Sequence, residues 1–169
     1  MYRRAYIILL ACFLTSCSIG YDITVQQDGA ALVNTSRDYD INEISRYYQS
    51  AVIFNIDTSV GSGTIISFEI STIDSLGYYL PYHPPGYFQF KMEGDTFTVK
   101  NGYSAAFKKN HWSCCSMNMY IKFSGDIQKI KLVSGKAKKK GKRTIRVFRT
   151  RKQLIKGKKK IDLTITLDE

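Results

Sequence analysis

Four side chains that could bind a metal or attack a substrate occur in two parts of the sequence. His83 lies in a segment rich in proline and aromatic residues, and His111 is followed closely by the adjacent pair Cys114 and Cys115. Imidazole and thiolate are ligands for zinc and copper, but this spacing matches no standard zinc pattern. Neighbouring residues of a strand point to opposite faces, so both thiols would reach one metal only from an irregular backbone. Unpaired thiols, a strained vicinal disulfide and a metal site remain as alternatives, and we expect no metal.

A further cysteine follows a short apolar segment at the N-terminus. A basic pair, R-R, precedes the ten-residue apolar run A-Y-I-I-L-L-A-C-F-L. A helix that crosses a bilayer needs about twenty apolar residues, so this combination is typical of a signal peptide. Residues Leu14–Cys17, L-T-S-C, resemble the lipobox of bacterial lipoprotein precursors. The resemblance implies cleavage after Ser16, diacylglycerol on the sulfur of Cys17, and acylation (palmitate, for example) of the new N-terminus.

The predicted precursor therefore consists of a lipoprotein signal peptide, residues 1–16, and one β-rich domain, residues 17–169. Two or three acyl chains hold a protein stably on a bilayer, so we expect a membrane-anchored protein of the cell envelope. A secreted protein with a cysteine here by chance is the alternative. The residues after Cys17 are S-I-G, with no acidic cluster. By resemblance to known sorting rules, the absence of an acidic cluster predicts that the protein lies on the periplasmic face of the outer membrane, in a cell that has an outer membrane.

Motifs for catalysis are absent from the sequence. It contains no G-x-S-x-G, no H-E-x-x-H and no convincing pair of carboxylates. We therefore expect a non-enzymatic protein without a cofactor. The alternative is a small envelope enzyme, either a hydrolase or a metal-dependent enzyme, that uses His83, His111, Cys114 and Cys115.

Charge is distributed unevenly in a chain with a net charge of +11. Residues 17–126 contain seven basic and eleven acidic residues, whereas residues 127–160 contain sixteen basic residues and no acidic residue. Such clustering of charge indicates which partners a protein binds rather than which fold it adopts. For an exported protein we expect no nucleic acid but anionic lipid or an acidic envelope polymer. The alternative is a set of solvated faces that keep the protein soluble.

The densest part of this basic segment is G-K-A-K-K-K-G-K-R, residues 135–143. The order of its glycines and lysines is not that of a phosphate-binding loop, and we expect a hairpin tip with a positive field. The residues predicted to bind an anionic surface are Lys136, Lys138, Lys139, Lys140, Lys142 and Arg143.

A second candidate site is Y-Y-L-P-Y-H-P-P-G-Y-F-Q-F, residues 78–90, which contains all three prolines of the chain. Proline blocks regular ladders, so we expect a loop from Pro81 to Gly86. Aromatic rings beside a rigid loop can line a pocket, stack on sugars or enter a membrane interface, or simply close one end of a β core. The candidate ligand-binding residues are Tyr78, Tyr79, Tyr82, Tyr87, Phe88 and Phe90.

Alternating apolar and polar residues predict that most of the domain forms strands. The alternating segments are residues 21–25, 66–70, 97–100, 117–123 and 161–167, and residues 52–56 form a short apolar run. Asp28-Gly29 predicts a tight turn, with residues 30–33 as the returning strand. Strands with one polar face suit an antiparallel sheet. Helix signals are confined to residues 40–49 and 150–157, each with a capping pair at its start. The predicted fold is α+β, predominantly antiparallel β, as a sheet or a sandwich with one or two short helices.

The order of these patterns resembles that of the LppM-type lipoprotein domain and related small bacterial lipoproteins. The resemblance rests on Y-D-I-T-V-Q-Q-D-G-A directly after the lipobox cysteine, on M-N-M-Y-I-K-F-S-G-D-I-Q-K-I, and on R-T-I-R-V-F-R-T-R-K-Q-L before the closing strand. It covers about half of the mature chain and includes no diagnostic catalytic or binding residue. It implies an α+β fold and the binding of an amphiphile or lipid. A protein partner is a further alternative for a non-enzymatic envelope lipoprotein.

Overall fold

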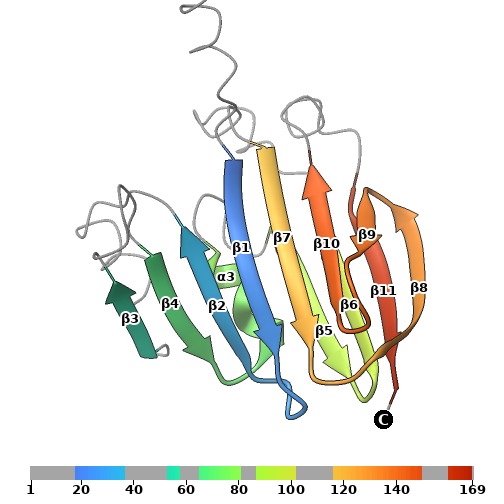
Figure 1. The fold of residues 1–169 in the computed structure, drawn as a ribbon, viewed down its shortest axis with the longest axis horizontal. Coiled ribbons are helices and arrows are strands. Elements are labelled where there is room, and N and C mark those ends of the chain that lie inside the picture. The colour runs from blue at the N-terminus through green and yellow to red at the C-terminus, as the bar shows by residue number, and fades with distance from the viewer. Residues whose placement is uncertain are drawn as a thin grey trace, which may run out of the picture.

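Two β-sheets and one short helical segment make up the described part of the protein (Figure 1). The structure is a computed structural model, and it describes residues 18–36, 53–57, 65–80, 87–101, 116–149 and 160–168. Seven of the described strands form the larger sheet and four form the smaller sheet. The α+β prediction, with mainly antiparallel β structure, is therefore confirmed.

The larger sheet contains a central parallel pair, β1 and β7, whereas its other neighbouring strands are antiparallel. Figure 1 shows β1 and β7 running downward and β10 running upward. In spatial order its strands are β3 (Ile53–Asp57), β4 (Ile65–Ile70), β2 (Ala31–Ser36), β1 (Ser18–Val25), β7 (Ser116–Phe123), β10 (Thr144–Arg149) and β9 (Ala137–Lys139).

The hairpin between β1 and β2 forms where the sequence predicts it. Gly29 has a φ of 84°, a backbone conformation that glycine adopts without strain. The N–H of Ala30 donates to Oδ1 of Asp28 at 3.0 Å, as aspartate side chains often accept in turns. The predicted Asp28-Gly29 turn is therefore confirmed.

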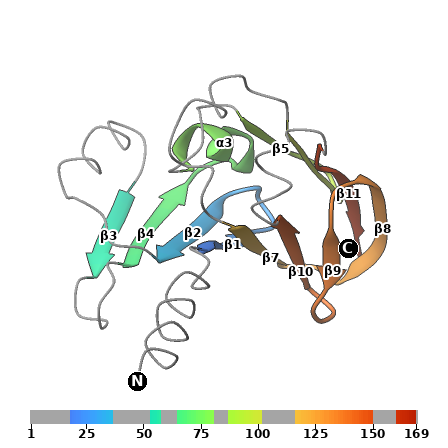
Figure 2. The same ribbon diagram turned by 90° about the horizontal axis from the view of Figure 1, so that it is seen from above.

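The smaller sheet is antiparallel throughout, and it meets the larger sheet at the connection between β7 and β8. Its strands, in spatial order, are β5 (Phe88–Glu93), β6 (Thr96–Asn101), β11 (Asp162–Leu167) and β8 (Ile127–Ser134). At the corner, the N–H groups of Phe123 and Ile127 donate to the carbonyls of Arg143 and Lys142, at 2.9 and 2.8 Å. Seen from above, the chain curls at this side, so that β8 and β11 turn out of the line of the larger sheet (Figure 2).

Alternation along the strands places apolar side chains between the sheets. On β7, Met117, Met119, Ile121 and Phe123 are at most 1% exposed, and on β11 the pattern alternates between buried and half-buried residues. Aromatic rings continue this core across the sheets, since the centroids of Phe97 and Phe123 lie 5.1 Å apart. The strands predicted from alternation are confirmed at residues 21–25, 66–70, 97–100, 117–123 and 162–167, and the apolar run 52–56 contributes β3.

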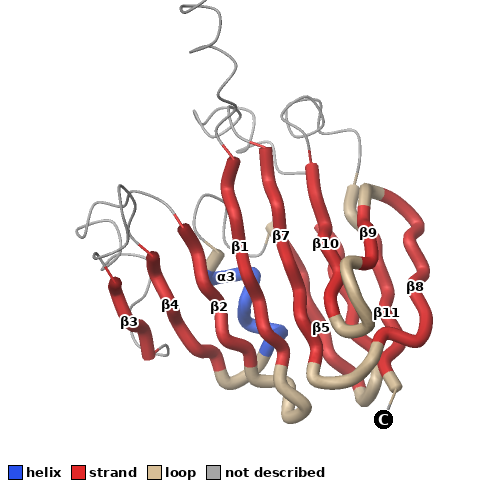
Figure 3. Tube along the Cα trace, viewed as in Figure 1, coloured by secondary structure: helices blue, strands red, loops and turns tan. Residues whose placement is uncertain are grey.

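The helical segment was not predicted from the sequence. It consists of the 3-10 helix η1 (Ile73–Ser75) and the α-helix α3 (Leu76–Tyr79), shown in blue behind the larger sheet in Figure 3. Gly77 permits its close packing, because a Cβ atom there would lie 1.8 Å from the carbonyl oxygen of Phe88 on β5. The helices predicted at residues 40–49 and 150–157 lie outside the described residues.

Candidate functional site

Several residues that the sequence singled out lie outside the described part of the structure. They are the predicted lipid-attachment residue Cys17, the aromatic residue Tyr82 in the predicted loop 81–86, and the potential metal-binding or catalytic residues His83, His111, Cys114 and Cys115. The described residues contain no group of three histidine, cysteine or acidic side chains arranged to hold a metal ion.

The aromatic segment divides between the surface and the core. Tyr78 is 63% exposed, whereas Tyr87, Phe88 and Phe90 are at most 9% exposed, and Tyr79 packs partly buried against the core. The hydroxyl of Tyr87 accepts a hydrogen bond from Nδ2 of Asn101 at 2.9 Å. Three of these aromatic side chains are therefore core residues at one end of the smaller sheet.

The sequence did not point to Asn101, which organises this end of the core. Its side chain is 4% exposed, its N–H donates to the carbonyl of Ile161 at 3.1 Å, and its Oδ1 accepts from the N–H of Ile161. A buried amide needs such partners, because a polar group without them costs free energy on burial. Asn101 thus joins the end of β6 to the start of β11.

The basic residues lie together at one edge of the larger sheet. Lys136 precedes β9, Lys138 and Lys139 belong to β9, and the others lie in the turn between β9 and β10. All six are exposed; they are Lys136, Lys138, Lys139, Lys140, Lys142 and Arg143, and we call them the basic edge. β9 is the last strand in the order of the larger sheet. This arrangement of positive side chains can attract an anion.

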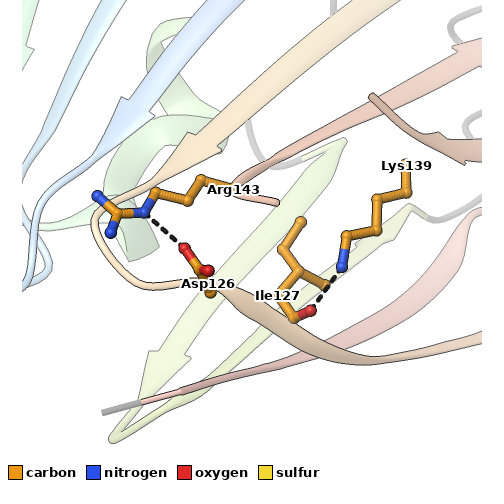
Figure 4. A network of polar contacts seen from close by, with 4 residues as sticks. All are labelled: Asp126, Ile127, Lys139 and Arg143. Carbon is orange, nitrogen blue, oxygen red and sulfur yellow. Dashed lines mark hydrogen bonds and ion pairs between the residues drawn. The ribbon is translucent and has the colours of Figure 1, made fainter. Parts of the chain in front are cut away.

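Two side chains of the basic edge are fixed against the corner between the sheets (Figure 4). Nε of Arg143 donates to Oδ1 of Asp126 at 2.7 Å, and Nζ of Lys139 donates to the carbonyl of Ile127 at 2.7 Å. The hydrogen bond from Arg143, with the positive charges of Arg143, Lys142 and Lys139, lowers the pKa of Asp126 from its ordinary value. The carboxylate therefore keeps its charge and holds the turn at the sheet edge.

Beside this ion pair lies an open polar cleft of about 620 Å³. The residues that line it are Gln27, Met92, Gly94, Asp95, Ser124, Gly125, Asp126, Arg143, Leu167 and Asp168. Two of its three carboxylates already have partners, because Asp126 accepts from Arg143 and Asp168 accepts from Nε2 of Gln128 at 2.8 Å. The cleft is therefore an open polar corner between strand ends.

A second group of polar residues lies on the outer face of the larger sheet, and the sequence did not single it out. Arg146 of β10 donates to Oδ1 of Asn118 through Nε at 2.9 Å and through Nη2. Its guanidinium carbon lies 5.6 Å from the ring centroid of Tyr120 and 5.1 Å from that of Phe148. Both distances are within the range of a cation–π contact. The available signal was the alternation of β10, which places residues 144, 146 and 148 on one face.

Within the part of the chain that the structure describes, no helical segment has the length and apolar character needed to cross a membrane. The described residues define a two-sheet α+β domain with a basic edge and a polar outer face.

No protein-family model and no curated protein matches the chain. Among solved structures, the chain is similar to the folded domain of LppM from Mycobacterium tuberculosis, determined by NMR, with a TM-score of 0.51 and 9% sequence identity. The match covers 91% of this chain and 91% of that domain. At this identity the similarity shows a shared fold, so the LppM-like arrangement implied by the sequence patterns is found in the structure.

Proposed function

We propose that this chain is a non-enzymatic lipoprotein of the cell envelope, anchored through lipid on Cys17, whose basic edge binds an anionic partner. The shared fold with the LppM folded domain supports the lipoprotein assignment that the lipobox resemblance implies. The amphiphile binding implied by the same resemblance belongs to this proposal as a further type of ligand.

One observation carries the anchoring proposal: β1 begins at Ser18, directly after Cys17. β1 is also an inner strand of the larger sheet, between β2 and β7. A lipid on Cys17 would therefore be joined to the sheet with no linker between them. One end of the larger sheet would lie at the bilayer surface.

The basic turn lies toward the opposite end of that sheet. Ser18 is level with Ser116, and Thr24 is level with Lys122, which pairs with Thr144 at the start of β10. Six residues of strand span about 20 Å, whereas electrostatic attraction falls off over a Debye length of about 8 Å at physiological salt. If the strands stand upright on the membrane, Lys140, Lys142 and Arg143 would act on a partner on the side away from the anchoring lipid.

The anchor is tested by Cys17→Ser in the full-length precursor, grown with radioactive palmitate. Because the thiolate is the acyl acceptor, the variant should remain unprocessed and carry no label. Cys12→Ser, within the predicted signal peptide, is the matched control and should be labelled like the unchanged protein. Full labelling of Cys17→Ser would rule out the proposed lipoprotein.

The proposed membrane is the outer membrane, with the protein on its periplasmic face, because S-I-G after Cys17 lacks an acidic sorting signal. Protease added to intact cells should then leave the protein undigested, and permeabilised cells should lose it. Digestion in intact cells would instead indicate display on the cell surface.

A further inference from the structure

The outer face of the larger sheet, which points away from α3 and β5 (Figure 2), is divided by charge. On β7, β10 and β9, together with the residue before β9, the described side chains that share this face include four cations and no acid: Lys122, Lys136, Lys138 and Arg146. On β1, β2 and β4, the described side chains of this face include Asp22 and Glu69 and no basic residue. A positive strip therefore lies along one side of a face whose other side is neutral to acidic.

The strip contains a guanidinium that is held in place before any ligand arrives. Arg146 lies opposite Tyr120 on β7 and opposite Lys138 on β9. Asn118 accepts from Nε and Nη2 of Arg146, and the remaining donors on Nη1 have no acceptor among the described residues. The rings of Tyr120 and Phe148 support its planar group. A positioned guanidinium loses little side-chain freedom when it binds a carboxylate or phosphate.

Further cations extend this arrangement along the strip. Nζ of Lys136 lies 5.9 Å from the ring centroid of Phe148, and the N–H of Phe148 donates to the carbonyl of Lys136 at 3.1 Å. Lys122 on β7 and Lys138 on β9 lie on the two strands that flank β10, and both are exposed. Residues two apart on a strand are separated by about 7 Å. A chain with repeated negative charges could therefore contact several of these groups in succession.

We infer that the outer face of β7, β10 and β9 binds an anionic polysaccharide, one that bears carboxylate or phosphate groups. This inference rests on the proposed envelope location, since an exported protein meets such polymers there. It goes beyond the basic edge, because its central residue, Arg146, and the supporting Tyr120 and Phe148 are not part of that group.

The division of charge favours a polymer chain over a bilayer. A bilayer lying against this face would cover β1, β2 and β4 as well, and would bring Asp22 and Glu69 against its own negative charge. A polymer chain that follows β10 would contact only the positive strip. Single-stranded nucleic acid is disfavoured for another reason: it needs open aromatic rings on which bases stack, and here Arg146 covers the two rings.

The test uses the full-length lipidated protein in nanodiscs of phosphatidylcholine, with polygalacturonate as the probe and neutral dextran as the uncharged control. Arg146→Gln should weaken binding of polygalacturonate about tenfold or more, the usual effect of losing a hydrogen bond to a charged group. Lys131→Gln, an exposed position on β8 of the other sheet, is the charge-matched control and should change binding less than about twofold. Arg146→Lys keeps the charge but not the planar fork, and should lie between the two.

Other outcomes separate this inference from the proposed function. If Arg143→Gln weakens binding of the polymer and Arg146→Gln does not, the basic edge binds anions and the inference about the outer face is wrong. If vesicles of phosphatidylglycerol bind through Arg146 while polygalacturonate does not bind, the partner is a membrane and the inference is also wrong. If neither probe binds at low salt, both the inference and the anionic partner of the proposed function are rejected.

Discussion

Strands β7 and β8 follow one another in the chain and have the same length, yet their environments are opposite. On β7, four alternating side chains are at most 1% exposed. On β8, Ile127 is the buried residue, whereas Leu132 and Val133 are 40% and 64% exposed. Because both segments are β-strands, the difference in side-chain exposure arises from their positions in the two sheets.

β7 lies between β1 and β10 in the larger sheet, and β8 lies at the edge of the smaller sheet. An inner strand buries one complete face against the core, while an edge strand has a neighbour on one side only. The basic residues of β8 and β9, which are the last strands in the order of their sheets, therefore lie where charge costs little stability. The comparison teaches that the basic edge lies outside the core, whereas on β7 and β10 core residues and proposed binding residues alternate along one strand.

The largest expected effect comes from deleting a core side chain of β7. Ile121→Ala leaves a cavity at a fully buried site, and such a change typically lowers the free energy of unfolding by about 2–5 kcal/mol. Urea unfolding of a soluble form that begins after Cys17, followed by circular dichroism, measures this value.

The matched change on β8 is Leu132→Ala, at an exposed position. Surface substitutions usually change the free energy of unfolding by no more than about 0.5 kcal/mol. Equal losses for Ile121→Ala and Leu132→Ala would contradict the comparison, because they would mean that β8 contributes to the core as much as β7.

Local patterns explain what could be predicted from the sequence. Met117, Met119 and Ile121 alternate with polar residues, and a two-residue period is a local property of a strand. The parallel pairing of Ser18 with Ser116 joins residues far apart in the chain, and no local signal specifies it. No local signal specifies the division of the strands into two sheets either.

The short helix shows why the remaining elements could not be predicted. The segment of η1 and α3 has too few residues for helical periodicity, and isolated helices of that length are unstable in water. Its conformation depends on tertiary packing, namely the burial of Ile73 and Leu76 and the contact of Gly77 with Phe88.

The candidate site, like the fold, was predictable from the sequence only where the signal is local. The density of lysine between positions 136 and 143 was visible in the sequence, and these residues are exposed in the structure. The contact of Arg146 with Asn118 and Tyr120 depends on the register between β10 and β7, which the sequence alone does not specify.

The next prediction separates binding from stability in the basic edge. Changing Lys138, Lys139, Lys140, Lys142 and Arg143 to glutamine should abolish most binding of the soluble form to vesicles that contain phosphatidylglycerol. Each basic residue near an anionic surface contributes about 1 kcal/mol, so several together account for measurable binding. The melting temperature should change little, because these side chains lie outside the core. The unchanged protein should also release from the vesicles as salt is raised.

The control for this experiment is the double variant Lys129→Gln and Lys131→Gln on β8, which removes charge from the same basic segment but not from the basic edge. It should retain most of the vesicle binding. If the unchanged soluble form ignores anionic vesicles even at low salt, the basic edge is a solvated surface, and its proposed partner should be abandoned. If the five-residue variant unfolds, the separation between fold and binding is wrong.

The smallest expected effect concerns the ion pair at the junction of β7 and β8. The hydrogen bond from Arg143 is the main cause of the lowered pKa of Asp126, so Arg143→Gln should raise this pKa toward its ordinary value of about 3.9. Because the pKa is lower in the folded state, the stabilisation is present above the ordinary pKa and is lost as the pH falls through the folded value. Side-chain carboxyl NMR during an acid titration measures the shift, with Arg146→Gln as the control that leaves Asp126 and its partner in place. An unchanged pKa in Arg143→Gln would show that Lys142 and Lys139 maintain the charge of Asp126 without Arg143. The positive charges of the whole basic edge, rather than one ion pair, would then keep Asp126 ionised at the junction of β7 and β8. Asp126 would in that case be the residue at which the structural region ends and the binding region begins.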